Sequence, residues 1–458
     1  MMKNIIENKI SKIYLILALT FGVIISLAMP FFNEPDGQYH FMVSSAITRH
    51  TVDISRYGEP KVGTGMNMQK NSYQNGKRFE KYYLTKATIM SPLQSPRGLD
   101  LDNKLSYNYL GHIIPAIGIW IGHRVYSSLG VMITFGRLFS MFVYTMAMYF
   151  IIKKVKFGKL TFMLVSLSPV IMNQFSSLSY DGLGYIVTAA IVALAINTIA
   201  EKSFDKRSLL YMFILAVSSI FLIKPNLLLA NLLFPVALVY VKLEENKQEA
   251  LLHSLSRKRK FNPKFSLIKK YKYLFIGAGA IFAFLAVLHM ASSSGGLLEV
   301  MARIWMSLTF QFFNTMSTTN VINLLVAPYP GFNYMPPWLI GLWFGLLFIG
   351  LLVDKKVYKS KFISLSSLGI IVLGVVSVYY GFLYSGSLVS SFGVRFGIQG
   401  VQGRYSTPLL LILPLVFSNE KIKLKVLGYH KVVLLMIFAV VISNFLLVFN
   451  TLWAMIYV

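Results

Sequence analysis

The chain contains no cysteine among its 458 residues. A disulfide framework, a cysteine-ligated zinc site and a thiol nucleophile are therefore excluded. Acidic residues are also scarce, since Asp and Glu together number 17. Charged residues of both signs make up 13% of the chain, about half of the roughly 25% that soluble domains carry. This shortage of charge excludes most soluble folds.

The chain is correspondingly rich in apolar residues. Hydrophobic residues make up 55% of the chain and aromatic residues 14%. This content excludes intrinsic disorder, which requires low hydrophobicity, and the aromatic share is typical of helices anchored at lipid–water interfaces. The composition predicts an all-α protein, a bundle of helices that spans the lipid bilayer many times.

The positive charge has a simpler explanation than nucleic-acid binding. Lys and Arg number 44, which gives a formal net charge of +27. A nucleic-acid-binding domain concentrates such charge on one folded face. Here the basic residues separate apolar runs instead, which is the pattern of cytoplasmic loops. We therefore expect no nucleic-acid partner.

Eleven apolar runs are candidate spans, each of which needs about 20 mostly apolar residues. The first run, Tyr14–Phe32, follows a short basic head, and no small-residue cleavage site follows Pro30. We interpret it as an uncleaved span with its N-terminus in the cytoplasm. The other runs lie near 131–152, 160–178, 182–200, 209–223, 227–242, 273–290, 338–353, 362–384, 405–418 and 432–454.

Basic residues orient these spans. With the N-terminus inside, the head and the cytoplasmic connectors hold 28 of the 44 Lys and Arg residues, as the positive-inside rule requires. Residues 107–130 are apolar enough to cross, but a crossing would invert every later loop, so we predict a surface helix there. The segments are then an external loop 33–130 with surface helices, core spans 131–242, a basic cytoplasmic linker 243–272, and C-terminal spans 273–458 with external loops 291–337 and 385–404.

An acidic motif follows directly on the first span. Pro35 and the apolar spacing after it predict an amphipathic helix with Asp36 in its first turn and His40 four residues on, on the same face. A carboxylate there can take a proton from an attacking hydroxyl or help to hold a divalent cation. Capping of the helix at the lipid boundary explains the same spacing equally well.

Three further external positions carry chemistry in this topology. Asp181 is the single acid between the third and fourth spans, and it either caps the next helix or completes a two-carboxylate site with Asp36. Lys224 lies outside against the charge trend, so it is a candidate phosphate contact or a snorkelling lysine at a turn. Near the tenth span, Arg404 and the neighbouring Arg395 can pair with a phosphate.

Three motifs together resemble a known architecture. They are Pro35-Asp36-Gly37-Gln38-Tyr39-His40, Ser179-Tyr180-Asp181 and Gln402-Gly403-Arg404-Tyr405, with Gly136-Arg137-Leu138 opening the second span. The pattern resembles the GT-C superfold of lipid-linked-sugar glycosyltransferases and, more narrowly, an uncharacterised bacterial family of polytopic membrane proteins. That family has Pro-Asp-Glu before its histidine, whereas Gly37 stands here in place of the Glu.

The resemblance implies a role for each matching residue. Asp36 is implied as the catalytic base, and Asp181 as its assistant or, with Asp36, as a ligand of a divalent cation such as Mg²⁺ or Mn²⁺. Arg404 and Lys224 are implied as contacts to the phosphate of the donor. We expect the other substrate-binding residues near them to be His40, Arg395, Gln402 and Tyr405.

The function that follows is a GT-C-type inverting glycosyltransferase of a bacterial cell membrane. It would move a sugar from a polyprenyl-phosphate donor to a cell-surface glycan or teichoic-acid-like acceptor, in a site that faces outside. Two alternatives stay open: a flippase or transporter for a lipid-linked glycan, and a polysaccharide polymerase. The polar loop 53–106 is predicted to act as a lid that orders on substrate binding.

Overall fold

The computed structural model describes most of the chain. The described residues are 2–57, 79–90, 101–255, 287–289, 291–292, 295–310, 323–328, 333, 335–384, 398, 400–420 and 428–457. Their regular structure is helical, and their only β-type pairings are two isolated bridges, between Val52 and Ile89 and between Tyr358 and Asn419. The predicted all-α class is confirmed.

Helices of very different lengths make up the described structure. The first part of the chain forms α1 (Met2–Ala28), α2 (Gly37–Ile47), η1 (Ile54–Tyr57), η2 (Glu80–Leu84), α4 (Tyr107–Leu110), α5 (Ile113–Val125) and α6 (Leu129–Lys154). The middle forms α7 (Lys159–Ser166), α8 (Pro169–Phe175), α9 (Asp181–Glu201), α10 (Lys206–Leu222), η4 (Pro225–Leu232) and α11 (Leu233–Leu255). The last part forms α13 (Leu297–Phe310), α15 (Trp338–Val353), α16 (Lys361–Tyr384), η7 (Gly403–Tyr405), η8 (Thr407–Ile412), α17 (Leu413–Phe417) and α18 (Tyr429–Tyr457).

Six helices of the described chain are long and apolar enough to cross a membrane. They are Lys9–Ala28, Leu129–Lys154, Asp181–Glu201, Pro225–Glu249, Lys361–Leu383 and Tyr429–Trp453, and two shorter apolar helices are Trp338–Val353 and Thr407–Phe417. The chain is therefore a polytopic helical membrane protein, while the predicted total of about eleven spans stays a prediction. Most of the run 273–290 lies outside the described residues.

The predicted span 160–178 is divided into two short helices. α7 ends at Ser166; Ser168 is the N-cap of α8 and accepts a hydrogen bond from the backbone N–H of Ile171, and Pro169 opens α8. Proline removes a backbone donor and cannot continue the preceding helix. Both short helices are almost completely buried, because the long helices α1, α6, α9 and α18 surround them.

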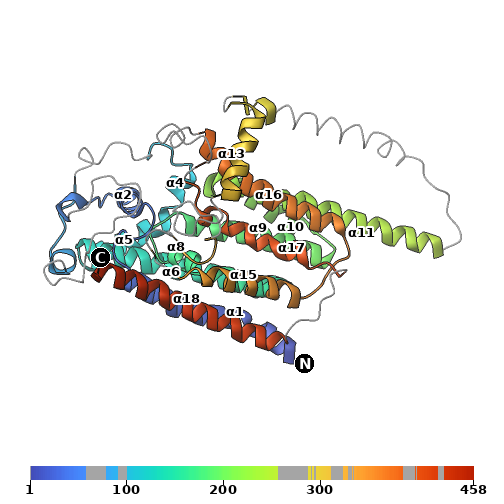
Figure 1. The fold of residues 1–458 in the computed structure, drawn as a ribbon, viewed down its shortest axis with the longest axis horizontal. Helices are drawn as coiled ribbons and strands as arrows, with labels where there is room; N and C mark the ends of the chain where they lie inside the picture. The colour runs from blue at the N-terminus through green and yellow to red at the C-terminus, as the bar shows by residue number, and fades with distance from the viewer. Residues whose placement is uncertain are drawn as a thin grey trace.

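The long helices run roughly side by side, with α2, α4 and α5 gathered at one end of the bundle and the N-terminus at the other (Figure 1). Three ion pairs link the lysine-rich connectors at the N-terminal end: Lys156–Glu201 at 3.1 Å, Lys202–Glu244 at 3.8 Å and Lys359–Glu420 at 3.2 Å. The rings of Phe157 and Tyr358, 6.5 Å apart, join the first of these connectors to the last. These connectors therefore gather on one side of the bundle.

The segment 107–130 contributes α5, which turns back against α6. A Cβ on Gly118 would lie 2.6 Å from the carbonyl oxygen of Phe135, and one on Gly122 would lie 2.8 Å from that of Val131. The two glycines thus allow the helix backbones to touch, a packing role that the sequence analysis did not assign to them. With 13 residues, α5 is shorter than the roughly 20 residues of a span.

A hydrophobic cluster packs the described part of the first loop against the hairpin of α5 and α6. Phe31, Phe41 and Tyr82 pack there with Ile119 and Met132 of α5 and α6. Residues 79–90 therefore form a packed part of the structure. Of the predicted lid 53–106, residues 58–78 and 91–100 lie outside the described residues.

Candidate functional site

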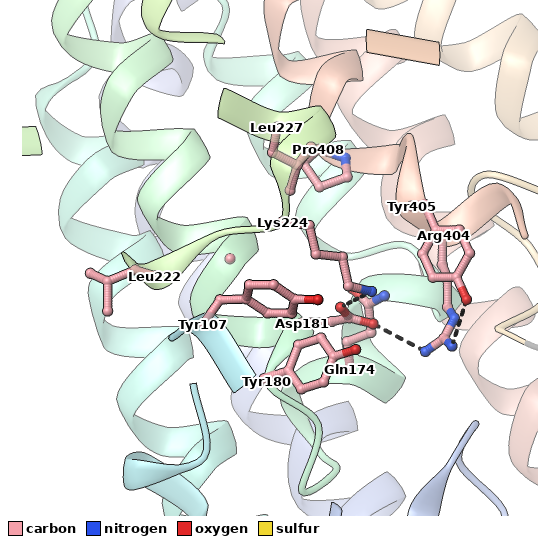
Figure 2. A pocket seen from close by; sticks show the side chains of 11 residues that line it. Tyr107, Gln174, Tyr180, Asp181, Leu222, Lys224, Leu227, Arg404, Tyr405 and Pro408 are labelled. Carbon is pink, nitrogen blue, oxygen red and sulfur yellow. Dashed lines mark hydrogen bonds and ion pairs between the residues drawn. The ribbon is translucent and has the colours of Figure 1, made fainter. Parts of the chain in front are cut away.

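Four of the predicted site residues meet at the end of the bundle opposite the lysine-rich connectors. Asp181 lies 2.7 Å from Lys224 and 3.0 Å from Arg404, and Arg404 lies 3.6 Å from Asp36. Figure 2 shows the Asp181 carboxylate between the Lys224 ammonium and the Arg404 guanidinium. We call these four residues the charged cluster. Its members come from positions up to 368 residues apart along the chain (36 to 404).

Asp181 is the centre of the charged cluster. It is the first residue of α9, behind the N-cap Tyr180, and its side chain is 10% exposed. Lys224 contacts one carboxylate oxygen and Arg404 the other. The carboxylate therefore pairs with two cations and does not act as the N-cap of α9, so helix capping does not explain this residue.

Lys224 owes its position to the proline that follows it. A residue before proline is driven out of the helical region, and Lys224 is extended (φ −63°, ψ 148°) between α10 and η4. Its ammonium lies 4.9 Å from the ring centre of Tyr180 and 4.3 Å from that of Tyr405. With its side chain 17% exposed and facing Asp181, Lys224 is not a lysine that snorkels to open water.

Arg404 is the most buried member, with its side chain 3% exposed. Its Nε donates to Oε1 of Gln402 over 2.7 Å, and one terminal nitrogen donates to Asp181. The other terminal nitrogen lies 3.4 Å from the Tyr405 hydroxyl and 3.6 Å from Asp36. Burial would lower the pKa of Arg404, but the surrounding groups, Tyr405, Asp181 and Asp36 first, raise it. The guanidinium is therefore a permanent cation.

Asp36 lies one residue before the first turn of α2, in which the sequence had placed it. It is the N-cap of α2 and not part of its first turn, and its backbone is left-handed (φ 57°, ψ 28°). Aspartate tolerates this conformation better than most residues. Its carboxylate makes no capping hydrogen bond with α2, faces Arg404 and is 35% exposed. Helix capping is therefore not its role.

His40 does not join Asp36 as predicted. Its Nδ1 lies 2.8 Å from Nε2 of His112, whose own Nδ1 contacts the carbonyl oxygen of Asn108. Both rings also pack edge-on against Tyr180, at 5.1 and 5.3 Å between ring centres. The left-handed residue before α2 turns the carboxylate and the imidazole in different directions. The sequence does not indicate His112 and Tyr180 as site residues, because no local spacing shows that they meet.

Glu34, two residues before Asp36, pairs with a residue outside the charged cluster. It forms a buried ion pair of 2.6 Å with Arg137, which also donates to the carbonyl oxygens of Met29 and Pro30. Glu34 therefore fixes the end of the first span and cannot replace the acid that is missing at Gly37. A Cβ on Gly37 would lie 2.8 Å from Cα of Phe32, so this backbone has no room for a larger residue without a shift.

Two cavities adjoin the charged cluster. A small one of about 10 Å³ lies against Asp181, Lys224 and Arg404 (Figure 2). A larger one of about 340 Å³ lies between η4 and α16, with Lys224 in its wall. Aromatic rings and a helix face line the larger cavity: Tyr107, Tyr180, Tyr405, Phe382, Val378 and Gly381. An amphipathic molecule with an anionic group can place its apolar part there and its anion on Lys224.

The residues do not fit a divalent cation as arranged. Both oxygens of Asp181 already face cationic side chains, and Mg²⁺ or Mn²⁺ would have to displace them. Among the residues that the structure describes, no group of three His, Asp or Glu side chains gathers as a metal site. Arg395, the remaining predicted phosphate contact, lies outside the described residues, whereas Gln402 and Tyr405 both contact Arg404.

Comparison with known proteins gives one family and no closer relative. A family model described as a predicted membrane protein (DUF2142) matches residues 19–413. No curated protein and no solved structure matches the chain, so the likeness to the GT-C superfold stays a prediction. The matched segment contains the charged cluster and most of the helical bundle. The chain therefore belongs to the DUF2142 family of predicted membrane proteins.

Proposed function

We propose that the protein is an inverting membrane glycosyltransferase. It moves a sugar from a polyprenyl-phosphate donor to a cell-surface glycan or teichoic-acid-like acceptor on the outer face of a bacterial membrane. The observation that carries this proposal is the charged cluster beside the aromatic cavity. The buried Arg404 and the half-buried Lys224 can bind a phosphate, the apolar wall of the cavity can bind a lipid chain, and a partly exposed carboxylate can act as a base.

The donor fits the cluster with its phosphate on the cations. Lys224 borders both the charged cluster and the 340 Å³ cavity. A phosphate placed at Lys224 and Arg404 therefore directs its prenyl chain along η4 and α16. The exposed apolar residues of α16, such as Val372 and Leu373, continue this surface toward the bilayer.

Asp36 is the base in this proposal. The O–H bond of the acceptor hydroxyl breaks and its proton passes to a carboxylate oxygen of Asp36. The acceptor oxygen forms a bond with the anomeric carbon, whose bond to the phosphate oxygen breaks, and the electron pair leaves on the phosphate. Attack opposite the leaving group inverts the anomeric carbon. Asp181 holds Lys224 and Arg404 in place for the leaving phosphate.

The distribution of charged residues supports a charged cluster on the outer side of the membrane. Asp181 opens α9, a helix of 21 residues, and Glu201 closes it beside Lys156. At about 1.5 Å per residue, the cluster and the lysine-rich connectors are about 30 Å apart along this helix, which is the thickness of a hydrocarbon core. Lysine-rich connectors favour the cytoplasm, so the cluster faces outside.

Sugar transfer by membranes that contain the Asp36→Asn variant tests the proposal. Transfer from a polyprenyl-phosphate sugar should fall by at least about 100-fold, since general-base catalysis supplies about 10²–10⁴-fold. Asp53→Asn is the matched control, because Asp53 pairs with the exposed Arg56 at 3.8 Å and should keep full transfer. Full transfer by Asp36→Asn would remove Asp36 as the base. Translocation of a lipid-linked glycan without any transfer by the wild type would favour the flippase instead.

A further inference from the structure

The contact between Asp36 and Arg404 is the loosest in the charged cluster. Asp181 is held at 2.7 Å by Lys224 and at 3.0 Å by Arg404, whereas Asp36 lies 3.6 Å from Arg404. The Asp36 side chain is 35% exposed and that of Asp181 is 10% exposed. Water screens an exposed, longer ion pair more strongly than a buried one. Asp36 is therefore the member that an incoming anion displaces most easily.

Arg404 has hydrogen-bonding capacity left on the side that faces Asp36. A guanidinium has five N–H donors. Nε of Arg404 is occupied by Gln402 at 2.7 Å and one terminal nitrogen by Asp181 at 3.0 Å. The second terminal nitrogen has contacts of 3.4 Å to Tyr405 and 3.6 Å to Asp36, both longer than the 2.7–2.9 Å of a charge-assisted hydrogen bond. This nitrogen is suited to a better acceptor.

Asp36 also stands between this nitrogen and the surroundings. Arg404 is 3% exposed while its partner Asp36 is 35% exposed, so an anion that approaches from that side meets the carboxylate first. The backbone oxygen of Asp36 accepts a hydrogen bond of 3.0 Å from the N–H of His40. The backbone at Asp36 is thus anchored to α2.

We infer that Asp36 masks Arg404 in the ligand-free protein, and that a phosphate group on Arg404 displaces the Asp36 carboxylate and frees it to accept a proton. The inference rests on the proposed function and deepens it, because donor binding becomes the step that prepares the base. Asp181 stays on Lys224 throughout, so the cluster keeps its framework. The donor must then bind before the acceptor.

The affinity for a prenyl phosphate tests the mask directly. Purified full-length protein in detergent is titrated with farnesyl phosphate and, separately, with inorganic phosphate. Asp36→Asn removes the competing negative charge and should bind farnesyl phosphate on the order of fivefold more tightly than the wild type, as expected for the loss of one partly exposed ion pair. Asp53→Asn, which removes an equivalent charge beside Arg56, should leave the affinity unchanged.

The possible outcomes separate the mask from other roles of Asp36. An unchanged or weaker affinity of Asp36→Asn overturns the inference, since a residue that acts only as a base does not compete with phosphate. Asp36→Ala provides a second variant, and its thermal unfolding shows whether the fold is retained. Tightening for farnesyl phosphate alone assigns the site to a lipid phosphate, and equal tightening for inorganic phosphate assigns it to the free anion. Either result supports the mask.

The wild type and Asp36→Asn together distinguish failure of the mask from failure of the proposed function. If Asp36→Asn binds phosphate more tightly but the wild type transfers no sugar, the mask stands and the glycosyltransferase proposal falls. If the wild type transfers sugar and the phosphate affinity of Asp36→Asn does not rise, the mask falls and the proposed function stands.

Discussion

The protons of the His40–His112 pair are assigned by its surroundings. The carbonyl oxygen of Asn108 can only accept, so Nδ1 of His112 carries a hydrogen and donates it. Nε2 of neutral His112 is then an acceptor, and Nδ1 of His40, 2.8 Å away, is the donor to it. A proton added to Nε2 of His112 would place two N–H groups against each other. The pair therefore connects α2 to the α4–α5 turn only while His112 is neutral.

This arrangement predicts a loss of stability in acid. Burial is the main cause that lowers the pKa of His112, to about 4, whereas an unfolded histidine titrates near 6.5. The unfolded state binds more protons between these values, so the stabilisation is complete above about pH 6.5 and is lost as the pH falls toward 4. At about 1.4 kcal/mol per pH unit, the loss is about 3 kcal/mol. Thermal unfolding in detergent between pH 7 and 4 measures it.

The comparison that isolates His112 is His112→Gln. Glutamine can still accept from His40 but does not titrate, so its stability should decline less steeply over the same pH range. Equal slopes for wild type and variant would show that the acid loss arises elsewhere. Burial, followed by the neighbouring His112, also lowers the pKa of His40 well below its ordinary value. His40 stays buried in the variant, so part of the acid decline remains there.

At the scale of the helices, a buried ion pair fixes the segment that follows α1 to α6. Arg137 of α6 and Glu34 are 1% and 3% exposed and lie 2.6 Å apart. Arg137 also donates to the carbonyl oxygens of Met29 and Pro30, the two residues that directly follow α1. The guanidinium thus ends α1 and sets the position from which the Asp36 segment starts.

Removal of one partner should destabilise the protein strongly. Glu34→Gln leaves Arg137 as a buried cation without its carboxylate, and such changes cost about 3–5 kcal/mol. The control is Glu201→Gln, which breaks the pair with Lys156 in which both side chains are about half exposed; it should cost less than about 1 kcal/mol. Thermal unfolding in detergent compares them. Equal losses would show that the Glu34 pair contributes no more than a surface pair.

The elements show what a sequence can and cannot predict. Apolar length predicted α6, α9, α16 and α18 closely, because a span requires a continuous apolar run. The same criterion treated 160–178 as one span, although Pro169 divides it. Length and hydropathy do not report such a break, which depends on whether neighbouring helices bury the freed backbone groups.

For the whole molecule, topology predicted which residues form the charged cluster but not the contacts of the residues around it. If alternating spans cross the membrane, residues 36, 181, 224 and 404 must lie at one end, and the structure has them in contact. Topology alone could not show that Glu34 pairs with Arg137 or that His40 pairs with His112. These partners are 72 or more residues apart and are selected by side-chain packing.

The absence of cysteine makes the orientation of the bundle directly measurable. Single cysteines introduced at exposed positions report their side of the membrane through a thiol reagent that does not cross it. Lys104→Cys lies in the loop predicted to be external, near α4, and Ser203→Cys lies in the connector between α9 and α10, next to Lys202. Both positions are exposed, and the wild-type chain, which has no thiol, gives the background.

If the lysine-rich connectors face the cytoplasm, intact cells label Lys104→Cys, and Ser203→Cys is labelled only after the cells are permeabilised. The reverse pattern would place the charged cluster on the cytoplasmic side and exclude a cell-surface acceptor. Because α9 is about 30 Å long and joins the cluster to the lysine-rich end, both cysteines cannot be labelled from the same side if this helix spans the bilayer. Labelling of both in intact cells would therefore contradict the spanning role of α9 itself.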